Sequence, residues 1–191
     1  MIALIAPAGA GKTTIMSILC KKYGYEKPIS WTTKKPRKEE IDGVDYNFIT
    51  TEAFYQLEKT GFWAEFTKFN GAYYAYSVDD IKMENGILTL DIEGINTLTN
   101  NGNKLTTIYI DVDERTREER IRLRGDPEEA IAKRALEDNE SGISNFKDKA
   151  DYVVNNESDN PQDAACEIYA IMHSEMKCSN SDFNCKLLDE L

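Results

Sequence analysis

The sequence predicts an α/β fold with a mostly parallel β-sheet, and its apolar runs, its helix-start signals and their order support this. Four short apolar runs have the length and composition of buried parallel strands. They lie at residues 2–6, 87–92, 105–111 and 152–154. Two helices are predicted to begin after Asp126 and Asn160, because each is followed by a proline, which fits the first turn of a helix. Strands that alternate with helices in this way typically form a parallel sheet covered by helices.

The chain is expected to form one unit that carries a lobe and a tail. Its 191 residues are enough for one well-buried core but too few for two ordinary domains. Residues 30–80 differ from the rest, because Tyr, Phe, Trp and Thr recur there in short alternating runs that predict a small mixed β lobe. We expect the exposed aromatic and charged side chains of this lobe to suit a binding cleft better than a core. The predicted division is a core at 1–29 and 81–177, the lobe at 30–80 and a C-terminal tail at 178–191.

The charge balance argues against a nucleic-acid or anionic-membrane surface. Asp and Glu number 34 against 23 Lys and Arg, which gives a net charge of -11. No apolar run approaches the roughly 20 residues that span a bilayer, and the chain opens without the pattern of a cleavable signal. The sequence therefore predicts a soluble, cytoplasmic protein that binds neither nucleic acid nor membrane.

The first strand is followed by a glycine-rich segment that reads Ala-Pro-Ala-Gly-Ala-Gly-Lys-Thr-Thr over residues 6–14. Between a strand and a helix, this is the pattern of a P-loop, with Ala6 in place of the usual first glycine. Backbone N–H groups and the helix N-terminus bind a triphosphate, Lys12 neutralises its outer phosphates, and Thr13 can ligate magnesium. The sequence thus predicts a three-layer P-loop NTPase fold. Its predicted ATP-binding residues here are Ala8, Gly9, Ala10, Gly11, Lys12, Thr13 and Thr14.

An arginine-rich stretch follows the third apolar run. Arg117, Arg120 and Arg124 recur at helical spacing, and Arg134 lies on the next predicted helix, so we expect a closing cationic lid over about residues 115–148. Glutamates are interspersed among these arginines, which also fits a solvated helix. We prefer that interpretation for three of them, Arg115, Arg117 and Arg122.

Several motifs, taken in order, resemble the guanylate kinase family of P-loop nucleoside monophosphate kinases. Ser30-Trp31-Thr32-Thr33-Lys34-Lys35-Pro36-Arg37, then Gly43-Val44-Asp45-Tyr46-Asn47-Phe48, then Glu65 and Tyr73-Tyr74 are similar to the lobe that binds the phosphate acceptor. The resemblance extends through Leu88-Thr89-Leu90-Asp91-Ile92-Glu93-Gly94, Arg120-Ile121-Arg122-Leu123-Arg124-Gly125, Ala132-Lys133-Arg134 and Asp151-Tyr152-Val153-Val154-Asn155. It covers residues 1–177 and leaves only the tail outside.

For the acceptor's phosphate, the resemblance implies four side chains of the lobe: Lys34, Arg37, Tyr46 and Tyr74. Lys34 stands where the family has an arginine, so a point charge replaces a planar, two-pronged donor, and we expect looser phosphate geometry.

For the acceptor's base, the resemblance implies that Glu65 accepts from guanine N1–H and the 2-amino group. Ser30 is a further predicted contact. Tyr76 falls where the family has a small hydroxyl residue near guanine O6, which makes Ser77 a candidate for that hydroxyl. Thr89 and Asp91 complete the set of positions, with Thr89 where an acidic residue is expected. Two roles remain open for Asp91, the guanine 2-amino group or the metal through water.

For the donor, the resemblance implies that Asn155 contacts the adenine. It assigns Arg120, Arg124 and Arg134, together with Lys12, to catalysis, because positive charge offsets charge on the transferring phosphoryl group. The expected cofactor is Mg2+, held by Thr13 and in one alternative by Asp91.

The primary functional hypothesis is transfer of the γ-phosphoryl group of MgATP to GMP or dGMP. One alternative is a kinase for another deoxynucleotide or a modified base, motivated by Lys34, Tyr76 and Thr89. Another is a catalytically silent binding module, against which the intact Lys12-Thr13 pair argues. Both a monomer and a homodimer are compatible with the sequence.

Overall fold

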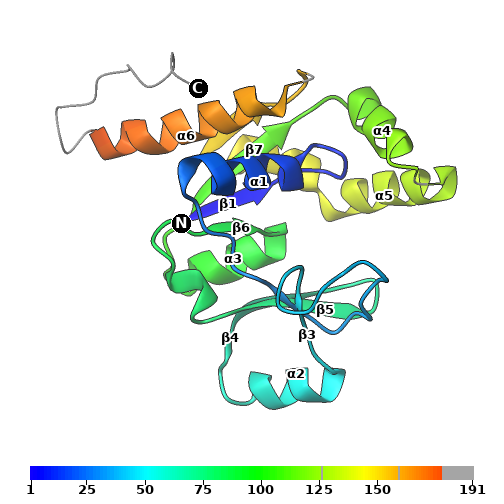
Figure 1. The fold of residues 1–191 in the computed structure, drawn as a ribbon, viewed down its shortest axis with the longest axis vertical. Helices are drawn as coiled ribbons and strands as arrows, with labels where there is room; N and C mark the ends of the chain where they lie inside the picture. Colours follow the sequence, from blue (N-terminus) through cyan, green and yellow to red (C-terminus); the bar gives the residue numbers. More distant parts are fainter. Residues whose placement is uncertain (126, 159, 178–191) are drawn as a thin grey trace.

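A computed structural model describes residues 1–125, 127–158 and 160–177. Figure 1 shows their arrangement as a central sheet with helices, a separate small lobe and a helical pair at one side. The strands are β1 (Ile2–Ile5), β2 (Trp31–Thr32), β3 (Asn47–Phe48), β4 (Trp63–Phe69), β5 (Ala72–Ser77), β6 (Ile87–Thr89), β7 (Thr106–Asp111) and β8 (Tyr152–Asn155). The α-helices are α1 (Lys12–Tyr23), α2 (Thr51–Glu58), α3 (Ile92–Asn100), α4 (Glu114–Leu123), α5 (Glu128–Ser141) and α6 (Pro161–Lys177), and the 3-10 helices are η1 (Asp80–Lys82) and η2 (Ile143–Lys149).

The main sheet has the order β6-β1-β7-β8, and each neighbouring pair is parallel. The four apolar runs form these four strands, so the predicted parallel sheet is confirmed. The second run is shorter than predicted, because β6 ends at Thr89 and Ile92 already lies in α3. The chain turns there because the Asp91 carboxylate accepts the Gly94 N–H at 2.7 Å and caps the helix.

Helices cover both faces of this sheet, which makes the three layers. In β1, Ile2 and Leu4 face one side and pack with α1 and α6, whereas Ala3 and Ile5 face the other side and pack with α3 and η2. This alternation follows from the two-residue period of a strand. α6 begins at Pro161 as predicted, and the Asn160 side chain accepts the Gln162 N–H at 3.2 Å. No helix in the described part of the chain is long and apolar enough to cross a membrane.

The lobe contains a second sheet of order β3-β2-β5-β4, in which β2 and β3 are parallel and the other pairs antiparallel. The small mixed β lobe is therefore confirmed. Its aromatic residues do more than line a cleft, because Phe54 of α2 is 1% exposed and lies at the centre of a core of the lobe's own. The rings of Tyr73 and Trp63 stack on Phe54 with centroids 4.4 and 5.1 Å away.

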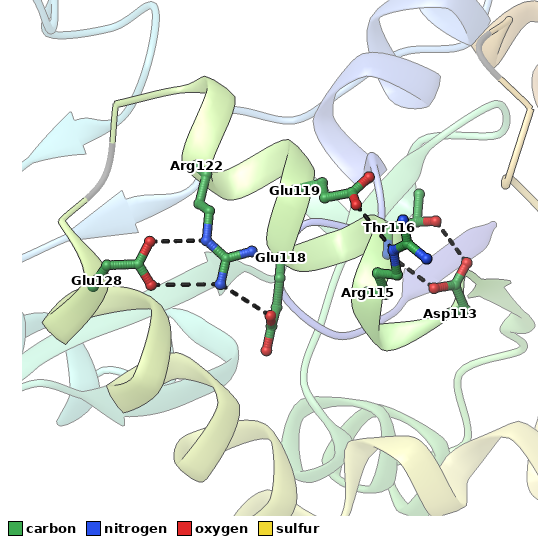
Figure 2. A network of polar contacts seen from close by, with 7 residues as sticks. All are labelled: Asp113, Arg115, Thr116, Glu118, Glu119, Arg122 and Glu128. Carbon is green, nitrogen blue, oxygen red and sulfur yellow. Dashed lines mark hydrogen bonds and ion pairs between the residues drawn. The ribbon is translucent and has the colours of Figure 1, made fainter.

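α4 and α5 form a helical pair beside the phosphate-loop end of the sheet (Figure 1). Asp113 caps α4 by accepting the Thr116 N–H at 2.9 Å. Figure 2 shows Arg122 of α4 between Glu118 and Glu128, and the Nε of Arg122 donates to Glu128 of α5 at 2.8 Å. The side chains of Arg122 and Glu128 are exposed, so this ion pair between the two helices lies in solvent. The predicted helix cap at Asp126 and the predicted tail at 178–191 lie outside the described residues.

Candidate nucleotide site

The segment between β1 and α1 is a tight loop, and two of its positions have a backbone conformation that favours glycine. Gly9 and Gly11 have φ of 80° and 94°, in the left-handed region. A Cβ at Gly9 would lie 2.7 Å from the carbonyl oxygen of Arg117, and one at Gly11 would lie 2.6 Å from Nδ2 of Asn156. The close approach of α4 and of the turn after β8 thus depends on these glycines.

Asn156 holds this loop in place. It is 3% exposed, and its amide donates to the Ala10 carbonyl oxygen at 2.9 Å. Its backbone N–H donates to the carbonyl oxygen of Asp111 at the end of β7. The neighbouring Asn155, for which the resemblance implies a contact to adenine, is exposed, and its side chain accepts the Glu157 N–H at 3.0 Å. Sequence reasoning missed Asn156, although the Asn-Asn pair after an apolar strand offered two candidates.

Lys12 begins α1 and its ammonium donates to the carbonyl oxygen of Ala6. Burial lowers the pKa of Lys12 to about 8; the Asp138 carboxylate opposes this shift and the Arg117 guanidinium adds to it. The lysine is therefore held at the loop, close to one negative and one positive side chain. Thr13 follows on the exposed side of the first turn of α1.

The prediction that Arg117 is solvated is wrong. Its side chain is 14% exposed, and its Nη1 lies 3.4 Å from the Ala8 carbonyl oxygen and 3.3 Å from the Asp138 carboxylate. Asp138 also accepts the Ala8 N–H at 2.9 Å. The solvated interpretation holds for Arg115 and Arg122, which are exposed and paired with glutamates of the lid.

Of the arginines assigned to catalysis, the two with described side chains, Arg120 and Arg124, make no hydrogen bond to the loop in this conformation. Arg120 donates to the Ser158 carbonyl oxygen at 3.2 Å, on the turn after β8. Arg124 caps the C-terminal end of α4 and is exposed. The side chain of Arg134 lies outside the described part of the structure.

A cavity of about 400 Å³ lies between the lobe and the carboxyl end of β6, where parallel sheets commonly bind ligands. Five side chains predicted for the acceptor line it: Ser30, Tyr46, Glu65, Tyr74 and Asp91. Tyr46 and Tyr74 make an edge contact with ring centroids 6.0 Å apart. These residues come from β4, β5, the cap of α3 and the loops flanking β2 and β3, so only the folded lobe brings them together.

Glu65 is the most unusual group in this cavity. It is 4% exposed, and its Oε2 has no hydrogen-bond partner among the described residues. Burial, followed by the nearby Asp91 carboxylate, raises the pKa of Glu65 to about 8. A Cβ at Gly94 would lie 2.8 Å from Oε2, so a larger residue there would press on the carboxylate. A buried carboxylate oxygen without a partner suits a ligand that donates hydrogen bonds.

Tyr76 and Thr89 also line the cavity. Tyr76 pairs directly with Glu65 between β5 and β4 and is 4% exposed. Burial raises the pKa of the Tyr76 phenol, and hydrogen bonding to Thr89 acts in the opposite direction. Tyr76 and Thr89, the two departures from the family pattern around the acceptor's base, therefore contact each other in one wall of the cavity.

Three predicted acceptor residues lie outside the lining. Lys34 pairs with Glu40 and holds its ammonium 4.6 Å from the centre of the Tyr46 ring. Arg37 is exposed at the same turn. The Ser77 hydroxyl donates to Asp80 at 2.7 Å, at the start of η1. A hydroxyl committed to Asp80 weakens the case for Ser77 as a base contact.

A glycine-rich loop between the first strand of a parallel sheet and its helix defines the class of P-loop nucleotide-binding proteins. The family profile described as guanylate kinase matches residues 1–175. The chain belongs to the guanylate kinase family.

Individual relatives agree with this family. The chain is 35% identical to the guanylate kinase of Nitratidesulfovibrio vulgaris over 142 residues, covering 70% of this chain and 69% of the relative. It is 33% identical to that of Wolbachia pipientis over 183 residues, covering 92% and 90%. The crystal structure of guanylate kinase from Anaplasma phagocytophilum matches with a TM-score of 0.67 and 20% identity over 92% of this chain and 85% of the other. This last likeness supports the fold.

Proposed function

We propose that this protein transfers the terminal phosphoryl group of ATP to GMP or dGMP. The observation that carries the proposal is the buried Oε2 of Glu65, which has no hydrogen-bond partner among the described residues and lies in a cavity next to Asp91. Membership of the guanylate kinase family supports it independently, since the relatives bear the name of that enzyme.

Guanine fits this pair of carboxylates because its N1–H and 2-amino group are donors on one edge. Adenine has no proton on N1 and cannot donate from it to Glu65. Because burial favours the protonated form of Glu65 when no donor is present, adenine would bind without the hydrogen bonds that guanine makes to the ionised carboxylate, and the site would prefer guanine. This argument favours the 2-amino role for Asp91, whose carboxylate lines the same cavity.

The acceptor's phosphate would lie near the ring of Tyr46 and the hydroxyl of Tyr74. Lys34 is already held over the Tyr46 ring, and the exposed Arg37 can turn toward the phosphate from the same loop. The other residues proposed to contact GMP are Ser30, Glu65, Ser77 and Asp91. For Ser77 to do so, its hydroxyl must give up its hydrogen bond to Asp80.

The donor's phosphates would lie on the loop, contacted by backbone N–H groups and Lys12. The exposed Thr13 hydroxyl at the first turn of α1 fits a magnesium ion that arrives with the nucleotide, because phosphate oxygens and water complete such a shell. That ion would supply charge neutralisation between the outer phosphates. Arg120 and Arg124 on α4 would complete the cationic surface when the lid closes, with Arg134 on α5.

The test is phosphoryl transfer from MgATP to a panel of ribo- and deoxynucleoside monophosphates, measured as ADP release. We expect turnover of GMP or dGMP that Glu65→Ala abolishes and that the exposed lobe variant Glu58→Ala retains. If a monophosphate of another base is phosphorylated, and still is by Glu65→Ala, the proposal that guanine is the acceptor's base is wrong. ATP binding without transfer to any acceptor would instead support a silent binding module.

A further inference from the structure

The phosphate loop carries a carboxylate of the chain itself. Asp138, on the lid helix α5, accepts the Ala8 N–H at 2.9 Å and lies 3.3 Å from Nη1 of Arg117. The two side chains are 14% and 18% exposed, so the pair is largely withdrawn from water. The contact joins residues 130 positions apart in the chain and is therefore a product of the tertiary fold.

The groups around this carboxylate are those that a phosphate would use. They are a loop N–H, a guanidinium and, near enough to influence it electrostatically, the ammonium of Lys12. Carboxylate and phosphate oxygens accept from such donors with the same geometry, and guanidinium binds both. Asp138 thus occupies an anion position on the loop.

Arg117 has unused capacity for an anion. Its Nε is buried and has no hydrogen-bond partner among the described residues, while its Nη1 is shared between Asp138 and the carbonyl oxygen of Ala8. A buried donor without a partner is unfavourable, so a ligand that reaches Nε would gain from it. The carbonyl oxygen of Arg117 also lies against Gly9, which fixes this part of α4 beside the loop.

We propose that Arg117 is a phosphate-binding residue for the donor nucleotide, and that Asp138 holds the phosphate's position in the nucleotide-free protein. The proposal rests on the proposed function, since it concerns the same loop. On binding, the triphosphate takes the Ala8 N–H and the Arg117 guanidinium, and repulsion between like charges drives Asp138 away. α5 can follow, because among the described residues its other ion pair with α4, between Arg122 and Glu128, is exposed (Figure 2).

The first test measures ATP binding by calorimetry without any acceptor. Asp138→Asn keeps the shape of the side chain but removes the charge that competes with the phosphates. We expect ATP to bind about tenfold more tightly, because a tenfold change in affinity corresponds to the free energy of about one charge-assisted hydrogen bond. Glu140→Gln, an exposed residue of the same helix, removes an equal charge away from the loop and should leave the affinity within about twofold. Unchanged or weaker binding by Asp138→Asn overturns the proposal.

A second test separates Arg117 from a purely structural role. Arg117→Gln should weaken ATP binding about tenfold in the Asp138→Asn background. In the wild-type background the loss should be smaller, because the same change also removes the partner that holds Asp138 on the loop. Equal losses in the two backgrounds, or no loss in either, overturn the assignment.

The wild-type protein provides a readout that depends on no variant. Saturation with tripolyphosphate should shift the NMR signal of the Arg117 Nε–H and speed amide hydrogen exchange in α5 around Asp138. If amide hydrogen exchange in α5 does not change in the saturated protein, the proposal that phosphate displaces Asp138 is overturned. Because these measurements contain no acceptor, they fail or succeed independently of phosphoryl transfer to GMP.

Discussion

The ionisation of Glu65 predicts a specific pH dependence of stability. Its pKa is raised from 4.5 to about 8. Between these values the folded protein keeps a proton that the unfolded chain has released, so the free energy of unfolding falls as the pH rises through this window. At about 1.4 kcal/mol per pKa unit, the loss is about 1 kcal/mol at pH 5, about 3 at pH 7 and close to its limit of about 5 above pH 8. Glu65→Gln stays neutral and escapes this loss.

Urea unfolding of wild type and Glu65→Gln at pH 5, 7 and 8.5 measures the effect. The variant should gain stability over wild type as the pH rises, by about 2 kcal/mol between pH 5 and pH 7. Glu58→Gln, an exposed position of the same lobe, should run parallel to wild type. A difference between Glu65→Gln and wild type that does not change with pH would refute the buried, protonated carboxyl. In the same window, wild-type affinity for GMP should rise with pH, because guanine requires the ionised form.

Three further predictions concern the loop and the lobe. Asn156→Ala should lower the free energy of unfolding by about 1–3 kcal/mol by leaving the buried Ala10 carbonyl unpaired, and should weaken ATP binding; Asn155→Ala, at an exposed position, should leave the stability unchanged in the same thermal-unfolding experiment. ATP affinity should fall as the pH rises above about 8, where Lys12 loses its proton, and a flat profile between pH 7 and 9 would contradict this. Phe54→Ala should destabilise the protein by about 3–5 kcal/mol in urea unfolding, while ATP binding by the folded variant persists.

The strands of the main sheet were predictable because burial on both faces requires continuous apolar runs, and such runs are visible in a sequence. The mixed lobe was predictable for the related reason that aromatic alternation has a period of two. The end of β6 was not, since Leu90 continues the apolar run and only the capping bond from Asp91 to Gly94 ends it.

The acceptor cavity was predicted in part. Five of its lining residues were named from motifs, because the motifs are local and fixed in spacing. Lys34 and Ser77 were predicted too, yet they pair within the chain with Glu40 and Asp80, respectively. No sequence motif indicates these two pairings. The aromatic core around Phe54 was likewise taken for a cleft, because a sequence shows which residues are aromatic but not which ones stack.

By itself, the sequence determined the parallel sheet, the phosphate loop and the guanylate kinase family, since these depend on periodicity and on short contiguous motifs. Only the tertiary structure decided that Asn156 rather than Asn155 holds the loop, and that Arg117 lies beside it with Asp138. Both outcomes depend on contacts between residues more than 100 positions apart. The local sequence around Arg117 resembles that around its solvated neighbours on α4. Arg117 differs from them because it lies on the face of the helix that packs against the loop.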